Sequence, residues 1–133
     1  MGATQVTVTV RNPADLNRSW DGLFLVDTGA TDSMIPRVHL EAIGLKPKGQ
    51  RVYELADGSE LTFDVTTADL EFMGEIVGGT IIMGDDDNAE PLLGVTALES
   101  VGIEIDPKNQ RLKRLPAVRL KTLRPNSPRR TTP

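Results

Sequence analysis

The sequence predicts an all-β domain that carries two short helices. About seven or eight segments have the alternating or continuous apolar pattern of β-strands, and only two have the pattern of a helix. Clusters of Gly, Pro, Asp and Asn separate these segments at short intervals. Hydrophobic residues make up 38% of the chain but aromatic residues only 4%, which favours a core of Val, Ile and Leu. At 133 residues, the chain is long enough for one such domain and too short for two ordinary ones.

The first third of the chain predicts two strands and a helix. Residues 5–10 alternate as a strand with one buried face, and residues 23–26 read as a buried strand. Between them, an Asn-Pro pair and an Asp-Gly pair predict a loop over residues 11–21. Pro36 is expected to open a helix that runs to Ile43, because Pro is tolerated in a first turn and Gly44 suits the end.

The middle of the chain predicts a β-hairpin. Residues 51–55 and 61–65 are strand-like and flank the turn sequence Ala-Asp-Gly-Ser at residues 56–59. The apolar alternation then slips by one position, so we expect a bulge near Thr66 and Thr67.

The last third predicts two further strands, a helix and a final hairpin. A strand is expected over residues 75–83, interrupted by Gly78 and Gly79, and a short buried strand over residues 91–94. A helix is expected to begin at Thr96 with a capping box that includes Glu99. Residues 102–106 and 110–115 predict the hairpin.

A six-residue segment is repeated within the chain. Residues 40–45 (LEAIGL) align with residues 98–103 (LESVGI), and each copy follows a short apolar strand and a loop. The two halves of the domain are therefore expected to use one structural unit twice.

Charge divides the chain into two parts, which we interpret as a domain over residues 1–116 and a basic tail over residues 117–133. The first 106 residues hold all 19 acidic residues and six of the 15 basic ones, and the remaining nine basic residues follow. The tail is expected to be a solubilising arm or to lie on the acidic body. Nucleic acid is the less favoured partner, because the tail has no aromatic residue to stack on bases.

Composition also excludes several classes of protein. With no Cys and one His, the chain predicts no disulfide, no thiolate chemistry, no zinc site and no cofactor. Residues 1–10 alternate with Thr instead of forming an apolar run, and no segment reaches transmembrane length. We therefore expect a cytoplasmic protein with no signal peptide and no membrane partner.

The motif that carries chemistry is Asp27-Thr28-Gly29, at the end of the apolar run of residues 23–26. A buried strand of this kind would carry the Asp27 carboxylate toward the molecular centre, with the Thr28 hydroxyl beside it. Gly29 would let the backbone fold back tightly. Hydrolysis by carboxylates needs two of them close together and sharing one proton. The motif occurs once, so a symmetric dimer would have to supply the pair.

Together with the central hairpin and with Leu92-Leu93-Gly94 before a short helix, this motif resembles the retropepsin-like aspartic proteases, from about Val6 to Leu115. The resemblance implies a closed, barrel-like fold and an obligate homodimer, with the site at its two-fold axis. It also implies an endopeptidase that acts on peptide or protein substrates.

The resemblance implies a role for each residue of the motif. Asp27 would be the catalytic acid, and the Thr28 hydroxyl would reach across the two-fold axis to the opposite loop. Gly29 and Ala30 would line the floor of the site. Thr31 and Asp32 would flank the outer substrate subsites.

Two further segments take roles from the same resemblance. The expected flap tip, which would close over the substrate, comprises Ala56, Asp57, Gly58 and Ser59. The residues expected to pack beneath the active-site loop are Leu92, Leu93 and Gly94. The flap has fewer glycines than retroviral flaps, and the chain continues past the point where retroviral chain ends build the dimer interface.

The same residues also fit other functions. The same fold could serve as an inactive dimerisation or peptide-binding module, and a third alternative uses the basic tail to bind nucleic acid. His39 is expected to be an ordinary helix residue, and the acidic run at residues 85–88 a solvated loop instead of a calcium site. Trp20 is expected to cap one end of the barrel. Tyr53 could contact substrate or simply pack.

Overall fold

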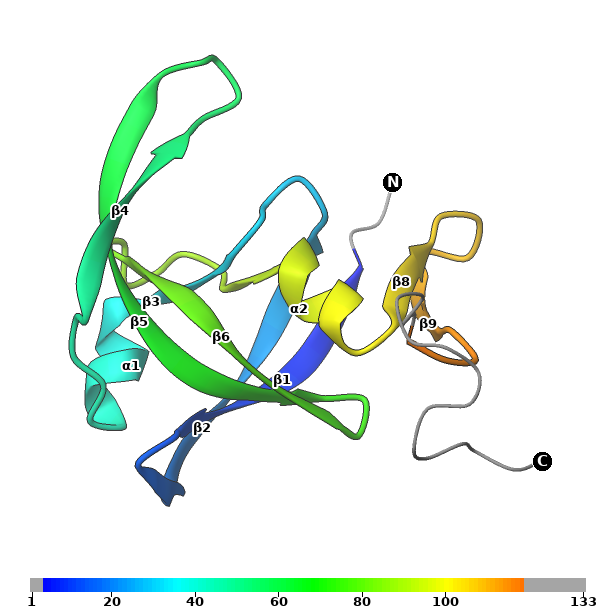
Figure 1. Cartoon of the computed structure of the whole chain (residues 1–133), viewed down its shortest axis with the longest axis horizontal. Coiled ribbons are helices and arrows are strands. Elements are labelled where there is room, and N and C mark those ends of the chain that lie inside the picture. Colours follow the sequence, from blue (N-terminus) through cyan, green and yellow to red (C-terminus); the bar gives the residue numbers. More distant parts are fainter. Residues whose placement is uncertain (1–3, 119–133) are drawn as a thin grey trace, which may run out of the picture.

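The computed structural model describes residues 4–118 of the chain (Figure 1). Its elements in chain order are β1 (Gln5–Asn12), β2 (Asp15–Asp27), β3 (Ser33–Pro36), α1 (Arg37–Ala42), β4 (Gly49–Glu54), β5 (Glu60–Phe72), β6 (Glu75–Gly84), β7 (Leu92–Gly94), α2 (Val95–Ser100), β8 (Ile103–Asp106) and β9 (Arg111–Arg114).

Six of the strands form a closed ring. The main sheet has the order β1-β2-β7-β3-β6-β5-β4, and an additional pairing of β1 with β5 joins its ends, so that only β4 lies outside the ring. Most neighbours are antiparallel, but β2–β7 and β3–β6 are parallel. The predicted fold class, an all-β closed barrel with two short helices, is therefore confirmed.

The core fills the inside of this ring and the space beneath the two helices. On β1 and β5, every second side chain points inward. The fully buried large side chains are mostly aliphatic, as the composition predicts: Phe24, Phe72, Ile35, Leu40, Leu70, Ile81, Met83, Leu93, Leu98, Ile103, Val8 and Val10.

The loop predicted over residues 11–21 was wrong. β1 continues to Asn12 and β2 starts at Asp15, so only the turn at Pro13 and Ala14 lies between two long antiparallel strands. Trp20 pairs across the hairpin with Val10, and this pairing overrides the local Asp-Gly turn signal. The strand that leads to Asp27 is also buried on one face only, because Leu23 is 53% exposed.

The bulge expected near Thr66 and Thr67 was also wrong, because β5 pairs with β6 without a break in register. The apolar alternation slips because the first half of β5 pairs with β4 in a projecting hairpin (residues 49–65, here called the arm), whereas the second half pairs with β6 in the wall of the ring. There the opposite face of the strand turns toward the core, and Thr66 becomes its first buried residue. Gly78 and Gly79 likewise lie within a continuous β6.

The internal repeat corresponds to a repeated structural unit. In each copy a short strand leads into a six-residue helix, and each helix is followed by a glycine with positive φ, Gly44 at 86° and Gly102 at 70°. The predicted capping box was wrong, since α2 starts at Val95 with Gly94 at its N-cap and no side-chain cap.

The β1–β2 hairpin supports the C-terminal end of α1. Asn12 and Arg18 donate hydrogen bonds to the carbonyl groups of Ile43 and Ala42, at 2.9 and 3.2 Å. Trp20 stacks on His39, with ring centroids 4.0 Å apart, and packs against the core. His39 is thus a half-buried helix residue, as expected, and Trp20 packs between it and the core.

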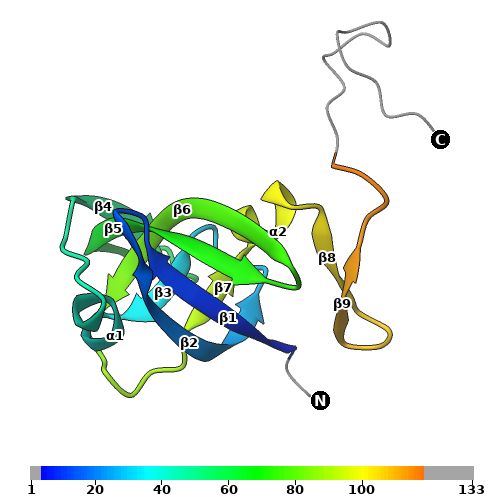
Figure 2. The ribbon, with the colours of Figure 1, turned by 90° about the horizontal axis from the view of Figure 1, so that it is seen from below.

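A separate two-stranded sheet, β8–β9, lies beside the ring (Figure 2). It confirms the predicted last hairpin. Arg114 joins it to the β5–β6 turn by an ion pair with Glu75 and a hydrogen bond to the carbonyl of Met73. Within residues 4–118, no helix is long and apolar enough to cross a membrane. The predicted tail lies outside the described residues from position 119 onward.

Candidate active site

Asp27 is the last residue of β2, at the point where β2 and β7 run parallel and end together. The register pairs Asp27 with Gly94. One carboxylate oxygen of Asp27 accepts a hydrogen bond from the N–H of Gly29 at 3.0 Å, and its carbonyl accepts one from Ala30 at 3.1 Å. These two bonds define a tight turn that presents a half-buried carboxylate.

Gly29 provides room in this turn and not an unusual backbone conformation. Its φ is not positive, so the turn does not depend on the left-handed backbone conformation that favours glycine. A Cβ at Gly29 would lie 3.3 Å from the Asp27 carboxylate oxygen, which is closer than most real contacts. A larger residue would therefore press on the group that the turn presents.

Residues 28–32, here called the active loop, are anchored by backbone hydrogen bonds from the start of α2. The N–H groups of Val95 and Thr96 donate to the carbonyls of Ala30 and Thr31 at 2.8 and 3.1 Å. These bonds use N–H groups that the first turn of a helix leaves without partners. The loop backbone is thus fixed by the opposite half of the domain.

Gly94 makes the closest contact with the active loop. A Cβ there would lie 2.6 Å from the carbonyl carbon of Asp32 and 2.8 Å from the carbonyl oxygen of Thr31. Leu93 is buried beneath the loop, and Leu92 is half-buried. Leu92 and Leu93 pair with Leu25 and Val26 of β2, and the contact with the active loop itself is made by Gly94.

Ser33 is a site residue that the sequence analysis missed. It is 3% exposed, and its hydroxyl accepts a hydrogen bond from the N–H of Gly94 at 3.0 Å. The sequence signal that could have identified Ser33 is a small polar residue at the start of the apolar strand β3. Burial of its hydroxyl there is favourable only if the hydroxyl has a hydrogen-bond partner.

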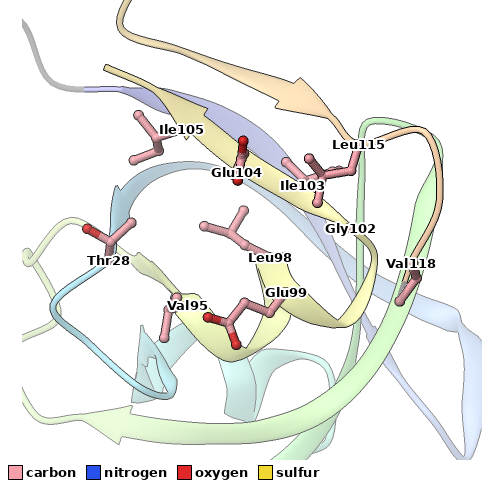
Figure 3. A pocket seen from close by; sticks show the side chains of 10 residues that line it. All are labelled: Thr28, Val95, Leu98, Glu99, Gly102, Ile103, Glu104, Ile105, Leu115 and Val118. Atoms are coloured by element: carbon pink, nitrogen blue, oxygen red, sulfur yellow. The ribbon is translucent and has the colours of Figure 1, made fainter. Parts of the chain in front are cut away.

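Thr28 faces away from the core, into a cavity of about 500 Å³ (Figure 3). The cavity is bounded by α2, β8 and the segment that follows β9, with Leu98 and Ile103 on its walls. Glu99 and Glu104 are exposed members of its lining. A cavity with apolar walls and two carboxylates in its lining therefore opens beside the carboxylate turn.

Asp32 lies under the arm formed by residues 49–65, and its side chain binds that arm. The Tyr53 hydroxyl donates to Asp32 Oδ2 at 2.6 Å, and Arg51 donates to the same oxygen at 3.1 Å. Burial, followed by the Asp32 carboxylate, raises the pKa of Tyr53 to about 12. Tyr53 thus packs, edge-on against Phe63, and its contact with Asp32 was not foreseen from the sequence.

The four expected flap residues lie at the tip of the arm, which projects from the ring on the same side as the active loop (Figure 1). Gly58 has φ of 86° and donates to the carbonyl of Leu55 at 2.9 Å, which makes a tight turn. Asp57 accepts hydrogen bonds from the hydroxyl and the N–H of Ser59, and these lower the pKa of its carboxyl. Ala56 is the remaining member of this exposed tip.

Metal ligands are not assembled in the part of the chain that the structure describes, since no three His, Cys, Asp or Glu side chains gather closely enough to hold an ion. The acidic run at residues 85–88 is exposed, and Asp86 caps its own loop by accepting from the N–H of Asn88 at 3.0 Å.

Comparison with known proteins places the chain in a family. Residues 13–100, more than half of the chain, match the family model described as "gag-polyprotein putative aspartyl protease". A search of curated proteins gives no match.

Solved structures have the same fold. The EIAV protease, solved with the inhibitor HBY-793, superposes with a TM-score of 0.59 at 18% identity, over 78% of this chain and 92% of that one. A retropepsin-like aspartic protease from Rickettsia conorii gives 0.51 at 24% identity, over 77% and 75%. The foamy viral protease–reverse transcriptase gives 0.50 at 17% identity, over 69% of this chain but only 11% of that longer chain. The chain therefore belongs to the gag-polyprotein aspartyl protease family and has the retropepsin-like fold.

Proposed function

We propose that the protein is an aspartic endopeptidase that works as a homodimer, with one Asp27 from each subunit. The observation that supports this most strongly is the half-buried Asp27 carboxylate at the ends of two parallel strands. The loop that follows it is held by backbone hydrogen bonds from the start of α2. One such turn holds half of the groups that the reaction needs. The two-fold axis of a dimer would supply the other half.

In this proposal the two Asp27 carboxylates share one proton. Two like charges a few ångströms apart cannot both ionise freely, so the pair holds one proton between its two carboxyl groups. The ionised Asp27 takes a proton from a water molecule, which attacks the peptide carbonyl, while the protonated one donates a hydrogen bond to the carbonyl oxygen. The proton taken from water then passes to the nitrogen of the leaving amine as the peptide C–N bond breaks. No cofactor takes part.

The cavity beside Thr28 supports a second copy on this face. Its walls carry apolar side chains of α2 and β8, which a partner subunit would remove from water. We assign to the Thr28 hydroxyl the contact across the axis. β8 lines this cavity, so the β8–β9 hairpin would contribute to the dimer interface in place of the chain ends that retroviral proteases use.

The remaining site residues take roles in substrate binding. Gly29 and Ala30 would form the floor, and the arm tip (Ala56, Asp57, Gly58, Ser59) would close over an extended peptide and exclude water. Thr31 and Asp32 would border the outer subsites. A cytoplasmic location remains part of this proposal.

Cleavage of a diverse peptide library from about pH 4 to pH 8, the range in which a coupled carboxylate pair changes state, tests the proposal. We expect the wild type to cut and Asp27→Asn to leave the library intact, with both proteins equally folded and dimeric. Cleavage by Asp27→Asn would overturn the assignment of the catalytic residue.

The second candidate is an inactive peptide-binding or dimerisation module. The arm tip favours this candidate, because Gly58 is the only glycine among residues 56–59 and closure of a flap requires backbone freedom. It predicts a dimer that binds peptides and leaves them uncut. Mimics of the tetrahedral intermediate would then bind no more tightly than ordinary peptides.

A further inference from the structure

Asp32 connects the active loop to the arm. Both Tyr53 and Arg51 donate to a single oxygen of its carboxylate, at 2.6 and 3.1 Å. The Asp32 side chain is only 12% exposed, whereas that of Arg51 is 51% exposed. The carboxylate is thus largely covered, and the charge that solvent meets at this point is the guanidinium of Arg51.

The arm has little other support from the side of the active loop. β4 is an edge strand that pairs only with β5 among the described strands, and all of its residues are exposed except Tyr53. Tyr53 packs on Phe63 of β5, with ring centroids 6.1 Å apart. Asp32 therefore holds a strand that would otherwise be fixed only by its own hairpin.

The protonation state of Tyr53 suits this contact. Burial and the Asp32 carboxylate raise its pKa to about 12, so the phenol keeps its proton and donates to Asp32 throughout the neutral range. Hydrogen bonds to an ionised acceptor are shorter and stronger than those between neutral groups, which agrees with the 2.6 Å separation.

This inference rests on the proposed function, because it assigns a role within the same site. We propose that Asp32, Tyr53 and Arg51 form a clasp that positions the arm over the active loop, and that Arg51 sets the charge preference of the adjoining outer subsite. Asp32 by itself would attract basic substrate side chains. Once it is covered by the clasp, the subsite favours acidic side chains and disfavours basic ones.

The clasp itself can be tested without a substrate, because Tyr53 is the only tyrosine in the chain. Phenolate absorbance therefore reports one residue. We expect the wild-type midpoint to lie above the ordinary value of 10.0 and to fall in Asp32→Asn, where burial alone still raises it, with circular dichroism verifying that both remain folded. The matched control is Asp87→Asn in an exposed loop, which should not move the midpoint. Equal midpoints in wild type and Asp32→Asn would overturn the clasp.

The charge preference can be tested with peptides in which Glu, Gln or Lys is placed at each position in turn. Binding to the Asp27→Asn form and kcat/KM of the wild type are both measured. At one outer position we expect Glu to be favoured over Lys by several-fold, Arg51→Gln to remove this difference and Arg51→Glu to reverse it. Arg11→Gln, which breaks an ion pair with Glu71 on the ring, is the control.

Tyr53→Phe separates positioning from packing, since it keeps the ring and removes the hydroxyl. We expect KM to rise several-fold with little change in melting temperature. An unchanged KM would contradict a positioning role for Tyr53.

Failure of the inference and failure of the proposed function look different. If the wild type cuts peptides and no position distinguishes it from Arg51→Gln, the inference fails and the protease assignment stands. If nothing is cut while Asp27→Asn binds peptides with the expected preference, the protease assignment fails and the clasp belongs to a binding module. If no peptide binds to either form, both the protease assignment and the subsite assignment fail.

Discussion

Gly94 and Asp32 are in direct backbone contact: a Cβ built on Gly94 would lie 2.6 Å from the carbonyl carbon of Asp32. The end of β7 and the active loop therefore have no space between them. Because the same strand is paired with Asp27, any shift of Gly94 moves both the carboxylate turn and the loop that follows it.

Gly94→Ala should disturb the site directly. The added methyl would force the loop away from its position, and overpacking of this kind costs about 1–3 kcal/mol of the free energy of unfolding. Misplacement of reacting groups lowers kcat/KM by roughly tenfold to a hundredfold. Urea unfolding and peptide cleavage measure the two effects.

Gly79→Ala is the matched control for this change, since Gly79 also lies in a strand of the ring but a Cβ there meets nothing within 4 Å. It should leave activity and stability nearly unchanged. Equal losses in Gly79→Ala and Gly94→Ala would show that the close contact with the loop is not the cause.

Ser33→Ala should destabilise the domain although it removes only one oxygen atom. The N–H of Gly94 would lose its acceptor at a buried position, and an unsatisfied buried donor costs about 1–3 kcal/mol. The exposed Ser19 on β2 provides the control Ser19→Ala. If the urea midpoints of the two variants agree, the Ser33 hydrogen bond contributes nothing to stability.

Asn12→Ala should loosen the end of α1. Asn12 is 9% exposed, donates to Ile43 and accepts from the N–H of Ala14, so its loss leaves two polar groups without partners. We expect a loss of about 1–3 kcal/mol in the free energy of unfolding, whereas Asn17→Ala on the exposed part of β2 should change little. The tryptophan fluorescence of Trp20, the single Trp, would report both transitions. A loss no larger than that of Asn17→Ala would contradict this role.

Acid should weaken the contact between Arg37 and Asp64. The hydrogen bond from Arg37, at 2.8 Å, lowers the pKa of the Asp64 carboxyl below its ordinary value of 3.8. A carboxyl with a depressed folded pKa adds stability above its unfolded pKa, and this stability is lost as the pH falls through the folded value. Asp64→Asn should therefore lower the urea midpoint at about pH 7 and have a smaller effect at about pH 3. A loss of equal size at both pH values would contradict it.

Much of the fold was predictable because local patterns and tertiary structure agree in this chain. The hairpin at Gly58, the helix after Pro36 and the repeated helix end at Gly44 and Gly102 each follow from residues whose backbone preferences are strong. The long β1–β2 hairpin was missed because strand pairing between distant residues overrides the turn signals near Asp21.

The candidate site was predictable only in part. Asp27 and the glycine beneath it stand in a recognisable order along the sequence, whereas the acceptor role of Ser33 depends on a strand that is far away in sequence. The contact of Asp32 with Tyr53 depends on how the arm leans, which no local pattern encodes. Spacing along the sequence predicts which carboxylate would react, whereas the packing of distant segments determines which residues support it.

The central claim is that two subunits each contribute one Asp27 to a single site. The most direct measurement is to unfold wild type and Asp27→Asn together, refold the mixture and measure cleavage as the wild-type fraction varies. If both carboxylates are needed, activity follows the square of that fraction, so an equal mixture retains about a quarter of the wild-type activity. Activity of about a half in the equal mixture would mean that each subunit acts alone, and about three quarters would mean that one Asp27 per dimer suffices; either result would contradict the account.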